Sequence, residues 1–284
     1  MKRFIAVVFV LPALLILAMS SSALAQSPSD VQLMVVANDL YTSGQYSEAT
    51  DFYEQLSRQG VHNWALYYNQ GNAYYNQGDI GPAILSYLRA QRITPRNGAL
   101  QSNLALARSQ VSDSSASEGE TPLAMWNDIT ERWLTLDELA LVTLAIWFAF
   151  SMMLVVMVII MPNRLKRLVK ILAIVVAIPM VAAFVALGSR LYADAVNPDV
   201  VVVADEVEVM TGPNNQYELQ LTMIGGDEAR LLDARGSWSK VSLRGGELEG
   251  WVLSDSIETV KSREANVLPL SGCLGSFQAD SCWE

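Results

Sequence analysis

The sequence predicts a multidomain membrane protein with an α-helical repeat region, two transmembrane helices and a small all-β barrel near its C-terminal end. Three observations predict this fold class: a tandem internal repeat, two long apolar runs without charge, and strand-like patterning after Val200. The expected order is a signal peptide (1–25), a repeat region (26–111, with units 30–63 and 64–97 and a capping helix 98–111), a linker and pre-membrane segment (112–136), a first transmembrane helix (137–161), a basic loop (162–170), a second transmembrane helix (171–189), a β domain (197–262) and a tail (263–284).

The composition shows why membrane segments have to be sought. The 284 residues are 51% hydrophobic and only 17% charged, whereas an average soluble domain is about one quarter charged. Lys and Arg total 19 against 29 Asp and Glu, a net charge of −10. This balance argues against a nucleic-acid partner, because phosphate binding needs a concentrated basic face.

The segment that ends at Ala25 has the three parts of a secretory signal peptide. Two positive charges at Lys2 and Arg3 precede an uncharged apolar stretch, and Ala23 and Ala25 form a small-residue cleavage site. Cleavage is therefore expected after Ala25, and the following region is exported. An uncleaved membrane anchor is the alternative interpretation.

Two further apolar runs predict the membrane spans. Residues 139–161 and 171–189 contain no charge, and each approaches the roughly 20 residues that a helix needs to cross hydrocarbon. Two buried core helices are the alternative. The loop between the runs contains four cations and no acid: Arg164, Lys166, Arg167 and Lys170.

A short basic loop of this kind stays in the cytoplasm under the positive-inside rule. The signal peptide independently places the N-terminal domain outside. We therefore expect a cytoplasmic (inner) membrane protein with two spans in the lipid bilayer, both domains extracytoplasmic or periplasmic, and only the loop cytoplasmic.

The repeat region has two units that align without a gap. Gly44, Ala49 and Tyr53 of the first unit correspond to Gly78, Ala83 and Tyr87 of the second. The second unit resembles a tetratricopeptide repeat, and 98–111 resembles the first helix of a third one. That half-repeat is expected to cap the stack.

The resemblance implies a concave groove that binds extended peptides of other membrane or extracytoplasmic proteins. Asparagines pair with a peptide backbone, and tyrosines give broad contact at modest entropic cost. Ordinary repeat consensus is the alternative explanation of these residues. The matching positions are Met34, Asn38, Tyr41, Tyr68, Asn69, Asn72 and Tyr75.

The β region resembles the bacterial SH3-like domain. Its three matching pieces are Val207-Glu208-Val209 followed by Gly212-Pro213, the strand Trp238-Ser239-Lys240-Val241, and Gly250-Trp251-Val252. Some members of that family bind peptidoglycan or peptides, which implies a ligand groove containing Tyr217, Trp238 and Trp251. Packing of the two tryptophans in the barrel core is the alternative that the sequence favours.

The only two cysteines, Cys273 and Cys282, lie in the tail. Export makes a local disulfide between them the favoured expectation, with two free thiols or an intermolecular bridge as alternatives.

No catalytic role is expected from this sequence. The single histidine, His62, argues against histidine-rich metal sites, and GxSxG, HExxH and phosphate-loop patterns are missing. We therefore expect neither an enzyme, a metal site nor a cofactor. An exported hydrolase with paired carboxylates is a remaining alternative.

The order of these parts resembles the BatE-type proteins of Bacteroides aerotolerance operons. The resemblance implies a membrane-bound scaffold that works with other Bat proteins, including those with von Willebrand A-type domains. The alternative function is that of a cell-wall accessory protein that binds peptidoglycan through the SH3-like domain.

Overall fold

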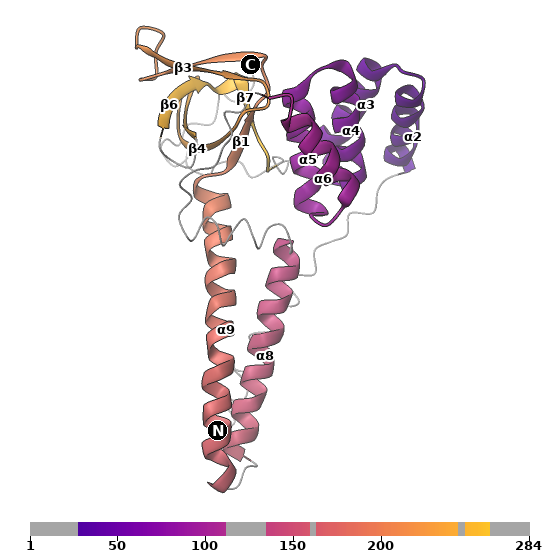
Figure 1. The fold of residues 1–284 in the computed structure, drawn as a ribbon. Helices are drawn as coiled ribbons and strands as arrows, with labels where there is room; N and C mark the ends of the chain where they lie inside the picture. Colours follow the sequence, from indigo (N-terminus) through magenta and orange to yellow (C-terminus); the bar gives the residue numbers. More distant parts are fainter. Residues whose placement is uncertain (1–27, 112–134, 160–162, 244–247, 262–284) are drawn as a thin grey trace, which may run out of the picture.

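The chain folds into a helical region, a pair of long helices and a C-terminal β-sheet (Figure 1). The structure, a computed structural model, describes residues 28–111, 135–159, 163–243 and 248–261, with only the backbone of 156–159 and 163–172. The tail cysteines Cys273 and Cys282 and the expected signal peptide lie outside the described residues.

The helical region repeats its turns and caps from one unit to the next. Gly44 and Gly78 turn the chain with φ angles of 77° and 95°, which glycine adopts without steric cost. Asn63 and Asn97 cap the following helices, each accepting a backbone N–H with its side chain. The helices are α2 (Pro28–Thr42), α3 (Tyr46–Arg58), α4 (Trp64–Gln77), α5 (Ile80–Ile93) and α6 (Gly98–Arg108).

Small residues bring these helices together. A Cβ atom on Gly71 would lie 2.6 Å from the ring of Tyr87, so glycine is needed where α4 meets α5. Ala49 and Ala83 are fully buried, as is Tyr53 at the position equivalent to Tyr87. The tyrosine rings therefore fill the space between helices that the small residues leave.

Helices α8 (Leu136–Ile159) and α9 (Asn163–Val196) lie side by side below the other two parts (Figure 1). Two stretches, Leu136–Val155 and Ala173–Val196, are long and apolar enough to cross a membrane, and only 11% of each is buried. Ile174 and Ile178 are 66% and 68% exposed. Apolar helices this exposed are what lipid contact requires, and they differ from the core helices of a soluble protein.

The prediction of a loop at 162–170 is wrong, because the chain is helical from Asn163 onward. The helix α9 already begins at Asn163, so Arg164 and Lys170 belong to its first turns. Leu, Lys and Arg are good helix formers, and no glycine or proline follows until Pro179. The sequence offers nothing to stop a helix that starts directly after Pro162.

The C-terminal part is a seven-stranded antiparallel sheet with the strand order β3-β2-β6-β5-β4-β1-β7. The segment from Gly250 to Val260 contains the end of one strand and the whole of another, separated by the short 3₁₀ helix Ser254–Ser256. Valines from most of the strands form the core of the sheet. The strands are β1 (Asp199–Val202), β2 (Glu206–Met210), β3 (Leu219–Ile224), β4 (Glu228–Arg235), β5 (Trp238–Leu243), β6 (Leu248–Leu253) and β7 (Ile257–Thr259).

Strand β1 is buried on both faces, so its three valines do not alternate between a buried and an exposed side. Val200 and Val202 belong to the core of the sheet, whereas Val201 belongs to the core of the helical region together with Ile84 and Leu100. A continuous apolar run is typical of a strand covered on both sides. The helical region and the sheet therefore share a hydrophobic interface.

Glycines allow the close approach at this interface. A Cβ atom on Gly81 of α5 would lie 2.5 Å from the carbonyl oxygen of Val202. On the other side of the interface, a Cβ atom on Gly226 would lie 2.7 Å from Val111 and 2.8 Å from Ile84. The helical region and the sheet therefore approach each other so closely at Gly81 and Gly226 that neither position has room for a side chain.

Four arginines fix the helical region to later parts of the chain. They are all the arginines between positions 59 and 111, and each pairs with an acid from a different element. The pairs are Arg89–Glu258 (β7), Arg92–Asp194 (α9), Arg96–Glu138 (α8) and Arg108–Glu228 (β4).

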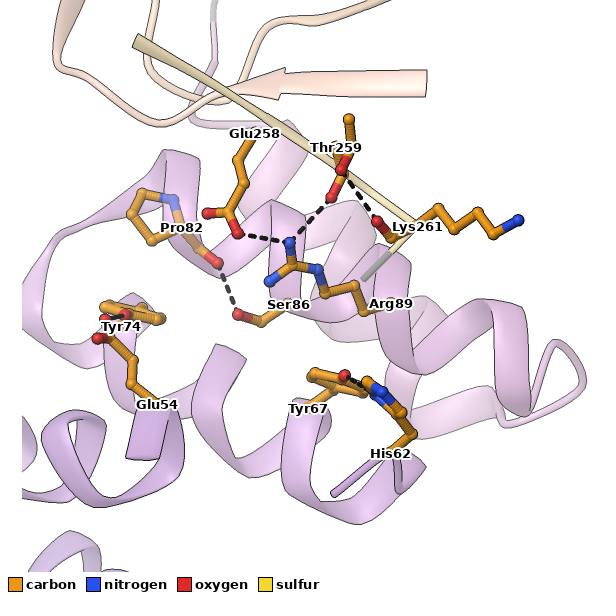
Figure 2. Close-up of polar contacts among 10 residues, drawn as sticks. All are labelled: Glu54, His62, Tyr67, Tyr74, Pro82, Ser86, Arg89, Glu258, Thr259 and Lys261. Carbon is orange, nitrogen blue, oxygen red and sulfur yellow. Dashed lines mark hydrogen bonds and ion pairs between the residues drawn. The ribbon is translucent and has the colours of Figure 1, made fainter. Parts of the chain in front are cut away.

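The most buried of these arginines is Arg89, whose side chain is 10% exposed. It donates to Glu258 at 2.7 Å and to the carbonyl oxygen of Thr259 at 2.9 Å (Figure 2). The contact ties α5 to the edge strand β7. A sheet edge covered in this way is protected from pairing with other chains.

Candidate partner-binding groove

A hollow of about 300 Å³ lies on the helical region and contains four of the seven predicted groove residues. Its walls come from α2, α4, α5 and α6, so it crosses both repeat units. The predicted lining residues are Tyr41, Tyr68, Asn72 and Tyr75, and the additional ones are Asn76, Tyr87, Asn103 and Leu106.

The asparagine oxygens near the hollow hold the repeats together. Asn72 Oδ1 accepts hydrogen bonds from the Tyr87 hydroxyl at 2.8 Å and from Asn103 Nδ2 at 2.9 Å. Asn38 Oδ1 accepts the equivalent bonds from Tyr53 at 2.7 Å and from Asn69 Nδ2 at 3.0 Å. Each asparagine thus joins its own repeat to the next one, and the whole arrangement recurs in the following unit.

Tyrosine hydroxyls line the hollow in a second repeated pattern. Tyr41 accepts from Asn76 Nδ2 at 3.2 Å, and Tyr75, at the equivalent position of the next repeat, accepts from Gln110 Nε2 at 2.6 Å. Tyr68 likewise accepts from Asn103 Nδ2, at 3.1 Å.

Tyr41, Tyr53 and Tyr87 remain protonated near neutral pH, because their pKa values are raised. Burial raises the pKa of Tyr41 above its usual 10, and the neighbouring Tyr46 adds to the effect. Burial likewise raises the pKa of Tyr53 and of Tyr87. Near neutral pH the hydroxyls are therefore hydrogen-bond donors, and none of the lining residues carries a charge.

The remaining predicted groove residues lie elsewhere. Met34 lines a separate hollow of about 130 Å³ with Val31, Val35 and other residues near the start of the helical region. Asn38 and Asn69 bond to each other and do not line the larger hollow. Of the seven predicted residues, four therefore line the larger hollow, one lines the smaller hollow, and two line neither.

Tyr87 and Asn103 are lining residues that sequence reasoning missed, although the repeat contained a signal for both. Tyr87 entered the prediction only as the repeat equivalent of Tyr53, yet it also lines the hollow. Asn103 stands one repeat period after Asn69, which was predicted. Extending the period into the capping helix would have found it.

Trp251 of the β domain is buried, in agreement with the favoured interpretation, whereas Trp238 is half-buried, and neither belongs to the valine cluster of the sheet. Register places Trp251 opposite Lys240, and Trp238 opposite Leu253, and residues directly opposite share one face. The core valines Val241 and Val252 alternate with these residues and therefore occupy the other face.

Trp251 is only 6% exposed, because other side chains cover it on the outer face. The Arg235 guanidinium lies 5.2 Å from the centre of its ring. Tyr217 is 52% exposed, and its ring lies against Gly212 at the end of the β2–β3 hairpin. No described contact joins Tyr217 to Trp238 or Trp251, so a common groove of all three is not seen.

Within the described residues, no group of three or more His, Cys, Asp or Glu side chains is placed to hold a metal ion. A scan against protein-family models finds no match to this chain, and a search of curated proteins finds none either.

Proposed function

We propose that the protein is a membrane-anchored extracytoplasmic scaffold whose helical region holds a partner protein in the hollow. The observation that carries this proposal is the division of surfaces on α5. Tyr87 of this helix lines the hollow, whereas Gly81 and Arg89 contact the β-sheet. The β domain therefore occupies one side of the helical region and leaves the hollow open.

The proposed membrane topology is supported by the exposed apolar helices and by the charges at one end of α9. The cations Arg164, Lys166, Arg167 and Lys170 are at the start of α9, where the positive-inside rule favours the cytoplasm. The helical region and β domain then lie together outside the inner membrane.

The pairs Arg92–Asp194 and Arg96–Glu138 fix the helical region at the outer ends of both spans. An arrangement of this kind suits the Bat-type aerotolerance complex that the order of domains resembles. The partners would be membrane proteins of the von Willebrand A type.

Crosslinking in intact cells tests this function. A photo-crosslinking residue at Leu106, which lines the hollow and is 52% exposed, is expected to capture a specific membrane or extracytoplasmic protein. The control position is Val36, which is 38% exposed and lines neither hollow. Capture of the same proteins from both positions, or of none from Leu106, would exclude the hollow as the partner site.

A second candidate function, peptidoglycan binding, is favoured by large apolar side chains on the surface of the β domain. Tyr217, Leu219 and Leu253 are 52%, 53% and 41% exposed, and exposed apolar surface often marks a binding site. We expect the full chain in detergent micelles to sediment with purified peptidoglycan. Replacing Tyr217 and Leu253 with serine should release it, and the exposed Leu191 on α9, replaced in the same way, is the control. Equal sedimentation of all variants, or none, removes this function.

A further inference from the structure

A group of large apolar side chains is exposed at one end of the helical region. Consecutive helices that are joined by short turns run antiparallel, so the starts of α2 and α4 lie at the same end as the last turn of α5. Val31 lies in the first turn of α2, Trp64 begins α4 and Ile93 ends α5. Their exposed fractions are 50%, 38% and 40%. We call this surface the Trp64 end.

The Trp64 end is also the end that contacts the two apolar helices. Arg96, in the turn between α5 and α6, pairs with Glu138, which directly precedes the uncharged run of α8. Arg92, in the last turn of α5, pairs with Asp194 near the end of α9. Figure 1 shows α5 and α6 with their lower ends close to the start of α8. The Trp64 end therefore faces the bilayer that these helices are proposed to cross.

The charges of the helical region are distributed in the same sense. Arg58, Arg92 and Arg96 at the Trp64 end each pair with an acid, so their charges are balanced locally. Most acids lie instead at the opposite end, where anionic headgroups would repel them. These acids are Asp39, Glu48, Asp51 and Asp79.

The exposed residue types suit a lipid headgroup layer. Tryptophan is enriched at membrane–water interfaces, because its ring enters the apolar layer while its N–H reaches polar groups. The Trp64 ring lies 6.2 Å from that of Tyr68, and this contact orients it at the start of α4. Ile93 and Val31 add apolar surface whose removal from water is favourable.

We propose that the Trp64 end rests on the phospholipid headgroup interface, with Trp64 and Ile93 inserted. The inference rests on the proposed membrane anchoring and adds a second membrane contact to the two spans. Together with the pairs formed by Arg92 and Arg96, it fixes the orientation of the helical region. Tyr41 and Tyr75 of the hollow lie near the ends of α2 and α4, away from this surface. The hollow is thus held open toward an extracytoplasmic partner.

Fluorescence quenching tests the contact with the full chain in vesicles of phosphatidylglycerol and phosphatidylethanolamine. An environment-sensitive nitrobenzoxadiazole label is attached at Ile93→Cys after both tail cysteines have been replaced with serine. Lipids that carry a nitroxide near the headgroup should quench this label strongly. The matched control is Gln45→Cys, an exposed position in the turn between α2 and α3 at the opposite end, where the same lipids should leave the label bright.

A second substitution tests the role of the tryptophan. Adding Trp64→Ser to the labelled Ile93→Cys chain should lower the ratio of docked to undocked protein by about tenfold, since burial of a large apolar side chain contributes about that factor. Leu106→Ser is the matched control, because Leu106 is 52% exposed but lines the hollow. It should leave the quenching unchanged.

A label at Ile174→Cys separates this inference from the membrane anchoring. Ile174 is 66% exposed on α9, and a nitroxide deep in the acyl chains should quench a label there. If it does not, the anchoring itself is wrong. Quenching at position 174 together with equal quenching, or none, at positions 93 and 45 overturns the headgroup contact and keeps the anchoring. Quenching at position 93 that Trp64→Ser does not change, or that Leu106→Ser lowers equally, also overturns it.

Discussion

Replacing Gly81 with alanine is expected to destabilise the protein, although alanine is normally the better helix former. The added methyl group would lie 2.5 Å from the carbonyl oxygen of Val202, a backbone atom that has no rotamer to change. The helical region has to move away from β1 to accommodate it. Over-packing of this kind costs about 1–3 kcal/mol, and the move also weakens the contacts of Val201 with the helical core.

The matched control is Gly98→Ala at the start of α6. A Cβ atom there meets nothing within 4 Å, so alanine should stabilise the protein by at most about 1 kcal/mol through helix propensity. Thermal unfolding of the full chain in micelles measures both changes. Hydrogen exchange at α5 and β1 should be faster in Gly81→Ala alone. Stabilisation by both substitutions would mean that the helical region and the sheet do not meet at Gly81.

The interface that Gly81 occupies shows where sequence reasoning reaches its limit. Gly44 and Gly78 stand at equivalent positions of the two units, and both turn the chain between helices, because a glycine turn is a local signal. An interface depends on which surfaces meet, and no local pattern encodes that. The run Val200-Val201-Val202 did contain a clue, since apolar and polar residues would have alternated in a strand with one solvent-exposed face.

The β domain shows the same limit. The strand positions could be read from the alternation around Trp238 and Val241, but the face to which a tryptophan belongs depends on register. Hydrophobicity alone suggested that Trp238 and Trp251 fill the core. In the structure Trp251 is indeed buried, but it lies on the face opposite to Val241 and Val252, where Arg235 covers its ring, and Trp238 on the same face is only half-buried.

The candidate groove was predicted in part for a physical reason. Tyr41 and Tyr75 recur at equivalent positions of two helices, so a period was enough to place them on one surface. Asn38 and Asn69 recur just as faithfully, yet they bond to each other between helices. Repetition identifies residues that have the same role in each unit, but it does not show whether that role is binding or packing.

Asn72 lines the hollow and also joins two repeats, and Asn72→Ala is expected to lower the free energy of unfolding by about 2–3 kcal/mol. The substitution leaves the Tyr87 hydroxyl without its acceptor at 2.8 Å, and Tyr87 is only 1% exposed. A buried polar group without a partner costs about 1–3 kcal/mol. Asn76→Ala is the matched control on the same helix, because Asn76 is exposed and its loss should change stability by less than about 0.5 kcal/mol.

A double-mutant cycle with Tyr87→Phe separates packing from binding. Phenylalanine keeps the ring and removes the hydroxyl, so the Asn72→Ala/Tyr87→Phe variant should be more stable than the two single losses predict, by about 1 kcal/mol. Additive losses would show that the Asn72–Tyr87 bond does not hold the repeat together. Partner capture at Leu106 should survive Tyr87→Phe, because Asn72 Nδ2 is retained, and should fall in Asn72→Ala. If capture falls equally in both variants, the loss of binding reports only a loosened repeat, and Asn72 is a structural residue alone.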